Sequence, residues 1–195
     1  NYMVLLTGFK KTRTAVFISG NGSNLKSLIK FSRKKISPIS INLIISSNYK
    51  SKGLEFAKKY KIKKKIFNFE KRSISEKAIL SELKENNINL ICLAGFMRIL
   101  SKYFVKNYKG IILNIHPSLL PKYKGLNTHE RVIKNKEIYS GCTVHYVNYK
   151  LDSGKIIIQK KVKIRQNDTP NSLSKRILNQ EHKLYPKAIL KIFNL

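Results

Sequence analysis

The segment that most constrains this chain is residues 111–121, which read IILNIHPSLLP. An apolar, β-branched run is typical of a strand buried on both faces, and Pro117 removes a backbone donor and ends that strand. Asn114 and His116 are two positions apart, so in a strand their side chains point to the same side. An amide and an imidazole at the carboxyl end of a core strand stand where open α/β sheets bind ligands. On this segment alone, two hydrogen-bonded structural side chains explain the pair equally well.

Short β-rich runs alternate with helical patterns along most of the chain, which predicts βαβ units. We therefore expect an α/β, doubly wound, mostly parallel sheet of the Rossmann-like kind. The predicted strands are residues 14–19, 39–46, 65–68, 90–94, 111–116, 142–147 and 155–162. The predicted helices are residues 24–34, 52–60, 75–86, 101–107, 128–135 and 169–193, the last of them opened by Thr169 and Pro170.

A glycine-rich turn, SGNGSNL at residues 19–25, connects the first predicted strand to the first helix. Such a turn exposes backbone N–H groups at a helix N-terminus, where an anion is favoured. A dinucleotide is disfavoured, because Leu25 occupies the third glycine position and the second strand ends without an acid for a ribose. A monophosphate fits better, with Ser23 and Asn24 bonding it or capping the helix; a plain tight turn is the alternative.

A second loop, LDSG at residues 151–154, places Asp152 between the last two apolar strands. An Asx-turn would account for this residue. If the two strands lie near residues 111–116, the carboxylate can instead approach His116. Pairing of aspartate with histidine favours the imidazolium and fixes the orientation of the ring.

Composition excludes several classes of protein. The 195 residues are 42% hydrophobic, which fits one globular domain, and no apolar run is long enough to span a bilayer. Residues 1–9 are short and lack a preceding basic region, so no signal peptide is predicted. Cys92 and Cys142 are far apart and form no CxxC motif, so we expect reduced, structural thiols and a cytoplasmic location.

The chain carries 40 Lys and Arg against 10 Asp and Glu, a formal net charge of +30. A nucleic-acid partner is one interpretation of so basic a chain. The cations, however, recur as short pieces throughout the sequence, and no aromatic-rich or groove-reading motif accompanies them. We therefore expect no specific nucleic-acid partner and no membrane association.

Five segments together resemble the phosphoribosylglycinamide formyltransferase family, the folate-dependent enzymes of purine synthesis. They are SGNGSNL, LAGFMRILS, NIHPSLLPKYKGLNTH, LDSG and QEHKLYP, in the family's order and spacing. The resemblance covers residues 12–195, expected as a single formyltransferase domain. Residues 1–11 are expected to be an extension of the kind that a cloning or fragment boundary leaves. Methionyl-tRNA formyltransferase and formyltetrahydrofolate hydrolase share versions of HPSLLP and remain alternatives, as does a basic nucleic-acid-binding protein on the same scaffold.

The resemblance implies two substrates, 10-formyltetrahydrofolate as cosubstrate and glycinamide ribonucleotide. The phosphate of the ribonucleotide would be bound by Gly22, Ser23 and Asn24, and Glu181 would hold the glycinamide portion. The residues that match the folate pocket are Leu93, Met97, Arg98, Ile99, Leu100 and Val147, with residues 147–152 as the other wall. Without the resemblance, LAGFMRIL would be interpreted as a core strand and a turn.

Formyl transfer needs the residue types found at positions 114, 116 and 152. An amine attacks the formyl carbon, and the developing oxyanion needs donors, which Asn114 and a protonated His116 can supply. Asp152 would favour the protonated imidazole and help to move the amine proton through water. No metal is expected, because His129, His145 and His182 lack metal-ligand spacing. We expect His145 to be structural.

Three positions depart from the family pattern. Lys124 stands where proline is common, and Asn127 stands where histidine is common. Leu178 stands where glutamine or lysine often approaches the phosphate, which weakens that expected contact. The sequence makes no prediction about oligomeric state.

Overall fold

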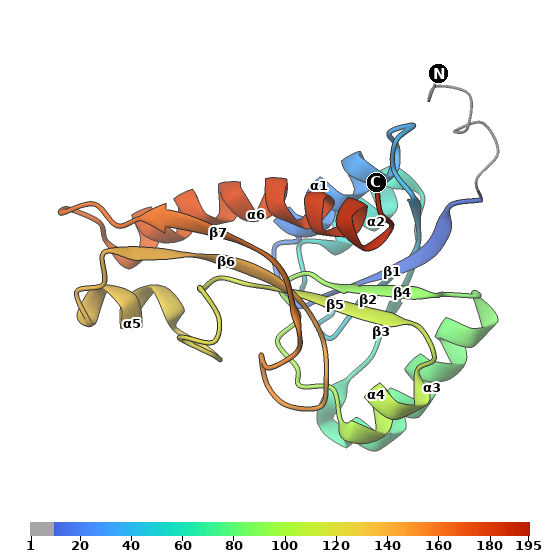
Figure 1. Ribbon diagram of the computed structural model, residues 1–195. Helices are drawn as coiled ribbons and strands as arrows, with labels where there is room; N and C mark the ends of the chain where they lie inside the picture. Colours follow the sequence, from blue (N-terminus) through green and yellow to red (C-terminus); the bar gives the residue numbers. More distant parts are fainter. Residues whose placement is uncertain (1–9) are drawn as a thin grey trace.

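The computed structural model describes residues 10–195, so all but the last two residues of the expected extension, residues 1–11, lie outside the described residues. Strands and helices alternate along the chain (Figure 1). The strands are β1 (Thr12–Ile18), β2 (Ile39–Ser46), β3 (Lys63–Ile66), β4 (Leu90–Leu93), β5 (Ile111–His116), β6 (Tyr139–Tyr146) and β7 (Ile156–Lys163). The helices are α1 (Ser23–Ser32), α2 (Leu54–Tyr60), α3 (Arg72–Glu85), α4 (Lys102–Asn107), α5 (Thr128–Lys134) and α6 (Pro170–Ile192), with a 3-10 turn at Phe69–Lys71.

The strands form one sheet in the order β3-β2-β1-β4-β5-β6-β7. The first five are parallel, and β6 and β7 are antiparallel to their neighbours. The predicted α/β class with a mostly parallel sheet is therefore confirmed. The strand order reverses between β1 and β4, and ligands of open α/β sheets bind at the carboxyl ends of the strands beside such a reversal.

Two hydrophobic cores cover the two faces of the sheet, as the residues of β1 illustrate. Val16 and Ile18 belong to one core, whereas Ala15 and Phe17 belong to the other. Side chains of a strand alternate between faces, so a continuous apolar run is what a doubly covered strand requires. Helices α1, α2 and α6 lie on one side of the sheet and α3 and α4 on the other (Figure 1).

The boundaries of some elements differ from the expected ones. The strand expected at residues 65–68 lies at Lys63–Ile66, an exposed edge strand, and two of its lysines pair with Glu82 at 2.5 and 3.2 Å. β3 is thus an edge strand with ion pairs to Glu82. It lacks the alternation of buried and exposed side chains by which a strand is located in a sequence. β6 begins at Tyr139 rather than residue 142, and the 3-10 turn before α3 was not expected.

Helix α6 is the longest element and spans 23 residues. It begins as expected at a Thr169 N-cap followed by Pro170, and Thr169 forms a capping box with Ser172. Within the described residues, no helix is both long and apolar enough to cross a membrane.

Candidate functional site

Asn114 and His116 lie on the same side of β5, at its carboxyl end. Leu113, which precedes Asn114, and Ile115, which lies between Asn114 and His116, point to the other side of the sheet and pack into the core there. This alternation is the one that the sequence predicts for a core strand. On the neighbouring strand β6, His145 lies directly opposite Asn114.

His145 contacts Asn114 through its side chain, which sequence reasoning did not foresee. The Nδ1 of His145 lies 2.8 Å from the carbonyl oxygen of Tyr146, which can only accept, so Nδ1 carries a proton. Burial lowers the pKa of His145, although that hydrogen bond and Asp152 oppose the shift, so the ring is neutral near pH 7. Nε2 is therefore a bare acceptor, and the Asn114 amide donates to it at 3.2 Å. One amide N–H of Asn114 is thereby fixed, and the other is left for a ligand.

The imidazole of His116 faces an acceptor at each ring nitrogen. Its Nε2 lies 2.8 Å from the carbonyl oxygen of Tyr123, and its Nδ1 lies 3.4 Å from Oδ2 of Asp152. A ring with acceptors on both sides is suited to the doubly protonated form. The side chains of His116 and Asp152 are only 7% and 8% exposed, so little water screens this pair.

The LDSG loop brings Asp152 to the histidines by a left-handed backbone, with φ of 44°. Oδ2 accepts the N–H of Gly125 at 2.8 Å, and Oδ1 lies 3.8 Å from Nε2 of His145. Gly154 has room only for hydrogen, because a Cβ there would lie 1.6 Å from the carbonyl oxygen of Tyr146. The Asp152 carboxylate thus binds across to another loop, which an Asx-turn does not explain.

We call Asn114, His116, His145 and Asp152 the polar cluster. It holds a neutral imidazole, an imidazole suited to a positive charge, a carboxylate and an amide with a free N–H. Amide and imidazole N–H donors can stabilise a developing oxyanion, and the carboxylate can receive a proton. The arrangement is suited to attack on a carbonyl group.

An apolar cleft of about 90 Å³ opens beside the polar cluster and includes Asn114, His145 and Asp152 in its walls. The expected folate residues that line it are Leu93, Arg98, Ile99, Leu100 and Val147. Met97 does not line it and is 63% exposed. Exposed apolar side chains, Met97, Ile99, Tyr149 and Leu151 among them, extend the apolar surface around the cleft. A patch of this kind marks a binding surface, and a large ligand would extend along it because the cleft is smaller than most ligand pockets.

The glycine-rich turn forms the start of α1 as expected, with Gly22 at the N-cap in a left-handed conformation, φ 73°. A Cβ at Gly22 would lie 2.6 Å from Cα of Gly53, so only glycine fits here. Among residues 10–195, no side chain caps the helix, and its first turn holds no acid. The N-terminal N–H groups of α1 are therefore open to an anion.

Asn24 connects this turn to α6. Its amide donates to Oε2 of Glu181 at 2.7 Å, and burial raises the pKa of Glu181. The other amide atom, Oδ1 of Asn24, is buried with no partner among the described residues. A buried unpaired acceptor costs free energy unless a ligand supplies a donor. We call Gly22, Ser23 and Asn24, together with Glu181, the α1 turn.

Helix α6 also contacts β4 and β5, the two strands whose carboxyl ends lie at the site. The hydroxyl of Tyr185, one turn after Glu181, lies 3.1 Å from the carbonyl oxygens of both Leu93 and Leu113. Leu93 ends β4, and Leu113 precedes Asn114 in β5. The same helix therefore contacts the α1 turn and the strand that carries the polar cluster.

The structure gives two of the family departures a local role. Lys124 donates to Oγ of Ser153 at 2.6 Å and so joins the loop after β5 to the LDSG loop. Asn127 is the N-cap of α5 in a left-handed conformation, which asparagine tolerates well. Leu178 is partly buried on α6, about one turn before Glu181, and brings no charge there.

The two remaining histidines, His129 and His182, are partly buried. Burial lowers the pKa of His129, with a contribution from His116, and burial alone lowers the pKa of His182. Among residues 10–195, no group of three or more His, Cys, Asp and Glu side chains is arranged to hold a metal ion.

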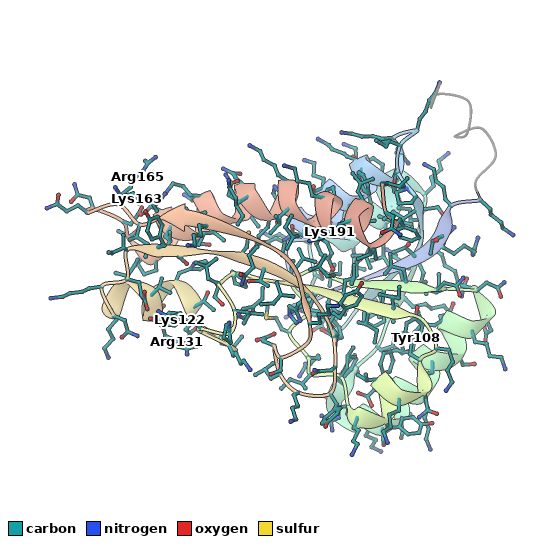
Figure 2. The ribbon with its side chains drawn as sticks, in the orientation of Figure 1. Tyr108, Lys122, Arg131, Lys163, Arg165 and Lys191 are labelled. Atoms are coloured by element: carbon teal, nitrogen blue, oxygen red, sulfur yellow. The ribbon has the colours of Figure 1, made fainter. Side chains whose placement is uncertain are left out.

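The basic side chains are spread over the molecule rather than gathered in one stripe. In Figure 2, Lys122 and Arg131 lie near α5, Lys191 lies on α6, and Lys163 and Arg165 lie at one end of the molecule, at the last residue of β7 and just after it. A nucleic-acid groove needs a continuous basic surface, whereas these labelled cations lie in separate regions of the molecule.

Known proteins resemble this chain over most of its length. Residues 12–189 match the family model described as formyl transferase. The chain is 44% identical over 183 residues to the trifunctional purine biosynthetic protein adenosine-3 of Bos taurus, covering 92% of this chain and 18% of that protein. It thus spans less than a fifth of such relatives.

Two shorter proteins match over most of both chains. Phosphoribosylglycinamide formyltransferase of Haemophilus influenzae is 40% identical over 180 residues, covering 91% of this chain and 85% of that protein. The crystal structure of phosphoribosylglycinamide formyltransferase from Brucella melitensis superimposes with a TM-score of 0.88 at 41% identity, covering 94% of this chain and 96% of the other.

Proposed function

The chain belongs to the formyl transferase family, and we propose that it is a phosphoribosylglycinamide formyltransferase of de novo purine biosynthesis. It transfers the formyl group of 10-formyltetrahydrofolate to the amine of N1-(5-phosphoribosyl)glycinamide. The observation that carries this proposal is the polar cluster, which combines a free Asn114 N–H with the His116–Asp152 pair beside an apolar cleft.

In the proposed reaction, the substrate amine attacks the formyl carbon, and the carbonyl electrons move to the oxygen. The free N–H of Asn114 and the Nδ1–H of His116 stabilise that oxyanion. The Nδ1–H also faces Asp152 at 3.4 Å, whereas the Nε2–H of His116 is bound to Tyr123 at 2.8 Å. A water-borne proton passes from the amine to Asp152 and then to N10 of the folate. The carbonyl re-forms as the C–N10 bond breaks, giving the N-formyl product and tetrahydrofolate. The N–H donors activate the carbonyl, so no metal takes part in the proposal.

The two substrates would occupy the two ends of the site. The phosphate of the ribonucleotide lies on Gly22, Ser23 and Asn24, where the N–H groups of α1 are open, and Glu181 holds the glycinamide portion. The folate lies in the apolar cleft formed by Leu93, Arg98, Ile99, Leu100 and Val147, with Met97 on its rim. We include a cytoplasmic location in the proposal, because Cys92 and Cys142 are both free and buried, as is usual in a reducing compartment.

The proposal is tested by following folate-product absorbance with each of three acceptors. The purified chain and 10-formyltetrahydrofolate are mixed with glycinamide ribonucleotide, with water alone, or with charged initiator tRNA. We expect turnover only with the ribonucleotide. Turnover only with the tRNA would show a tRNA formyltransferase, and equal turnover without an acceptor would show a hydrolase. With labelled tRNA and unrelated duplexes, binding should be indifferent to sequence and should fall steeply between low and physiological salt.

A further inference from the structure

The part of the chain that forms helix α1 and its neighbouring strands contains basic residues but no acidic ones. Residues 1–54 contain no aspartate or glutamate, so β1, α1 and β2 contribute no acid to this end of the site. The acid that contacts the turn is Glu181, and burial raises its pKa and so favours its neutral form. A dianionic group that approaches this end meets no fixed negative charge from these three elements.

Lys26 is the cation of α1 that lies nearest the turn in sequence. It is exposed, and its ammonium lies 5.7 Å from the centre of the Phe56 ring. The same ring borders Gly22, because a Cβ at Gly22 would lie 3.4 Å from it. Phe56 thus connects Lys26 to the N-cap of α1, and long side chains of a helix lean toward its N-terminus. Lys26 forms no salt bridge with a carboxylate in the described part of the chain, Glu55 included.

A second observation indicates that a ligand binds beside this helix N-terminus. Asn24 is 7% exposed, and its Oδ1 has no partner among residues 10–195. The acceptor and the open N–H groups of α1 belong to the same helical turn. A ligand that carries both a donor and an anionic group would satisfy both.

We propose that Lys26 is a substrate-binding residue whose ammonium contacts the 5′-phosphate held at the N-terminus of α1. This inference rests on the proposed function and adds a residue to its phosphate end. The ammonium exchanges its place over the Phe56 ring for a charge-assisted hydrogen bond to a dianion, the stronger of the two contacts at an exposed site. Lys26 then makes the enzyme discriminate in favour of the phosphorylated acceptor, at a turn where Leu178 of α6 brings no charge.

The test compares Lys26→Met with Lys30→Met, which removes an exposed cation one turn further along the same helix. Each variant is assayed with glycinamide ribonucleotide and with glycinamide riboside, which lacks the phosphate. We expect Lys26→Met to raise the KM for the ribonucleotide about tenfold, the effect of losing one hydrogen bond to a charged group. The KM for the riboside, the KM for the folate and kcat should not move. Lys26→Arg should restore most of the affinity, and Lys30→Met should behave as the unaltered protein.

Direct binding separates this inference from the proposed function. Inorganic phosphate is titrated calorimetrically into the unaltered protein, Lys26→Met and Ser23→Ala, without folate. Weaker phosphate binding by both variants in a protein that does not use the ribonucleotide would refute the proposed function and keep Lys26 in an anion site. A KM raised by Ser23→Ala and unchanged by Lys26→Met would keep the function and refute the role of Lys26. Equal losses in Lys26→Met and Lys30→Met would show only a general field effect and would also refute it.

Discussion

The polar cluster and the α1 turn differ in how completely their polar groups are paired. In the polar cluster, His145 binds Asn114 and Tyr146, His116 binds Tyr123 and faces Asp152, and Asp152 also binds Gly125. In the α1 turn, Oδ1 of Asn24 has no partner within residues 10–195, and no side chain caps α1. The first region is held in place by the protein itself, whereas the second has donors and an acceptor left over.

This difference matches two separate requirements of catalysis. Groups that stabilise a transition state are most effective when they are oriented in advance, because no reorganisation is then needed during the reaction. Groups that bind substrate gain affinity when the ligand supplies the missing partner. The comparison therefore predicts that substitutions in the polar cluster lower kcat and that substitutions in the α1 turn raise KM for one substrate.

The largest effect is expected in the polar cluster. Asn114→Ala should lower kcat by about a hundredfold or more, the usual loss when an oxyanion donor is removed. His116→Ala and Asp152→Ala should be at least as damaging, and the triple variant little worse than the worst single one, because the groups act as a unit. Steady-state kinetics with both substrates measures these losses, and circular dichroism checks the fold.

Asp152→Asn sharpens this prediction because it removes charge and keeps shape. Asparagine tolerates the left-handed backbone at position 152, and its amide oxygen can still accept the N–H of Gly125. Full activity with an unchanged pH profile in this variant would show that Asp152 only shapes the loop.

The next effect is expected in the α1 turn. Ser23→Ala and Asn24→Ala should each raise the KM for the ribonucleotide about tenfold and leave the KM for the folate nearly unchanged. Gly22→Val should be worse, because its side chain would meet the backbone of Gly53 and the left-handed φ disfavours it. If both KM values rise equally, the loop is damaged in general and the phosphate assignment is wrong.

A smaller effect should come from His145, which positions Asn114 through the hydrogen bond that it accepts from the Asn114 amide. His145→Leu should lower kcat about tenfold with little change in either KM, because the Asn114 amide loses its fixed partner. His145→Gln can still offer an oxygen acceptor and should recover part of the rate. Equal losses in both variants, with a lowered melting temperature, would point to packing instead.

Much of the site could be predicted from sequence because its signals are local. The alternation in residues 111–116 placed Asn114 and His116 on one side of β5, and Gly22 marked the start of α1. The fold followed from the alternation of strands and helices. These features depend on neighbours within a few residues, which a single sequence displays.

The role of His145 in orienting Asn114 could not be predicted, because it depends on the register of two antiparallel strands 31 residues apart. A one-residue slip would turn His145 to the other face of the sheet. The Tyr123 carbonyl that fixes His116 and the Gly125 N–H that fixes Asp152 are backbone groups, and their identity carries no sequence signal. The strand at Lys63–Ile66 was predicted at residues 65–68, because an exposed edge strand has no hydrophobic pattern to locate it.

The smallest effect is expected for stability, through Glu181. Burial raises the pKa of Glu181, so the folded state keeps a proton that the unfolded chain loses near the ordinary value of 4.5. As the pH rises through the interval between these two pKa values, the unfolded state binds fewer protons and the free energy of unfolding falls.

Glu181→Gln tests this argument, because the substituted side chain does not titrate and so removes this loss of stability. Its amide oxygen can still accept the N–H of Asn24. The melting temperature of this variant should equal that of the unaltered protein below pH 4.5 and exceed it at neutral pH. Calorimetric melting from acid to neutral pH measures the difference, with Glu130→Gln on exposed α5 surface as the control. A constant offset at every pH would show that the substitution changes packing and that the Glu181 carboxyl is not the titrating group.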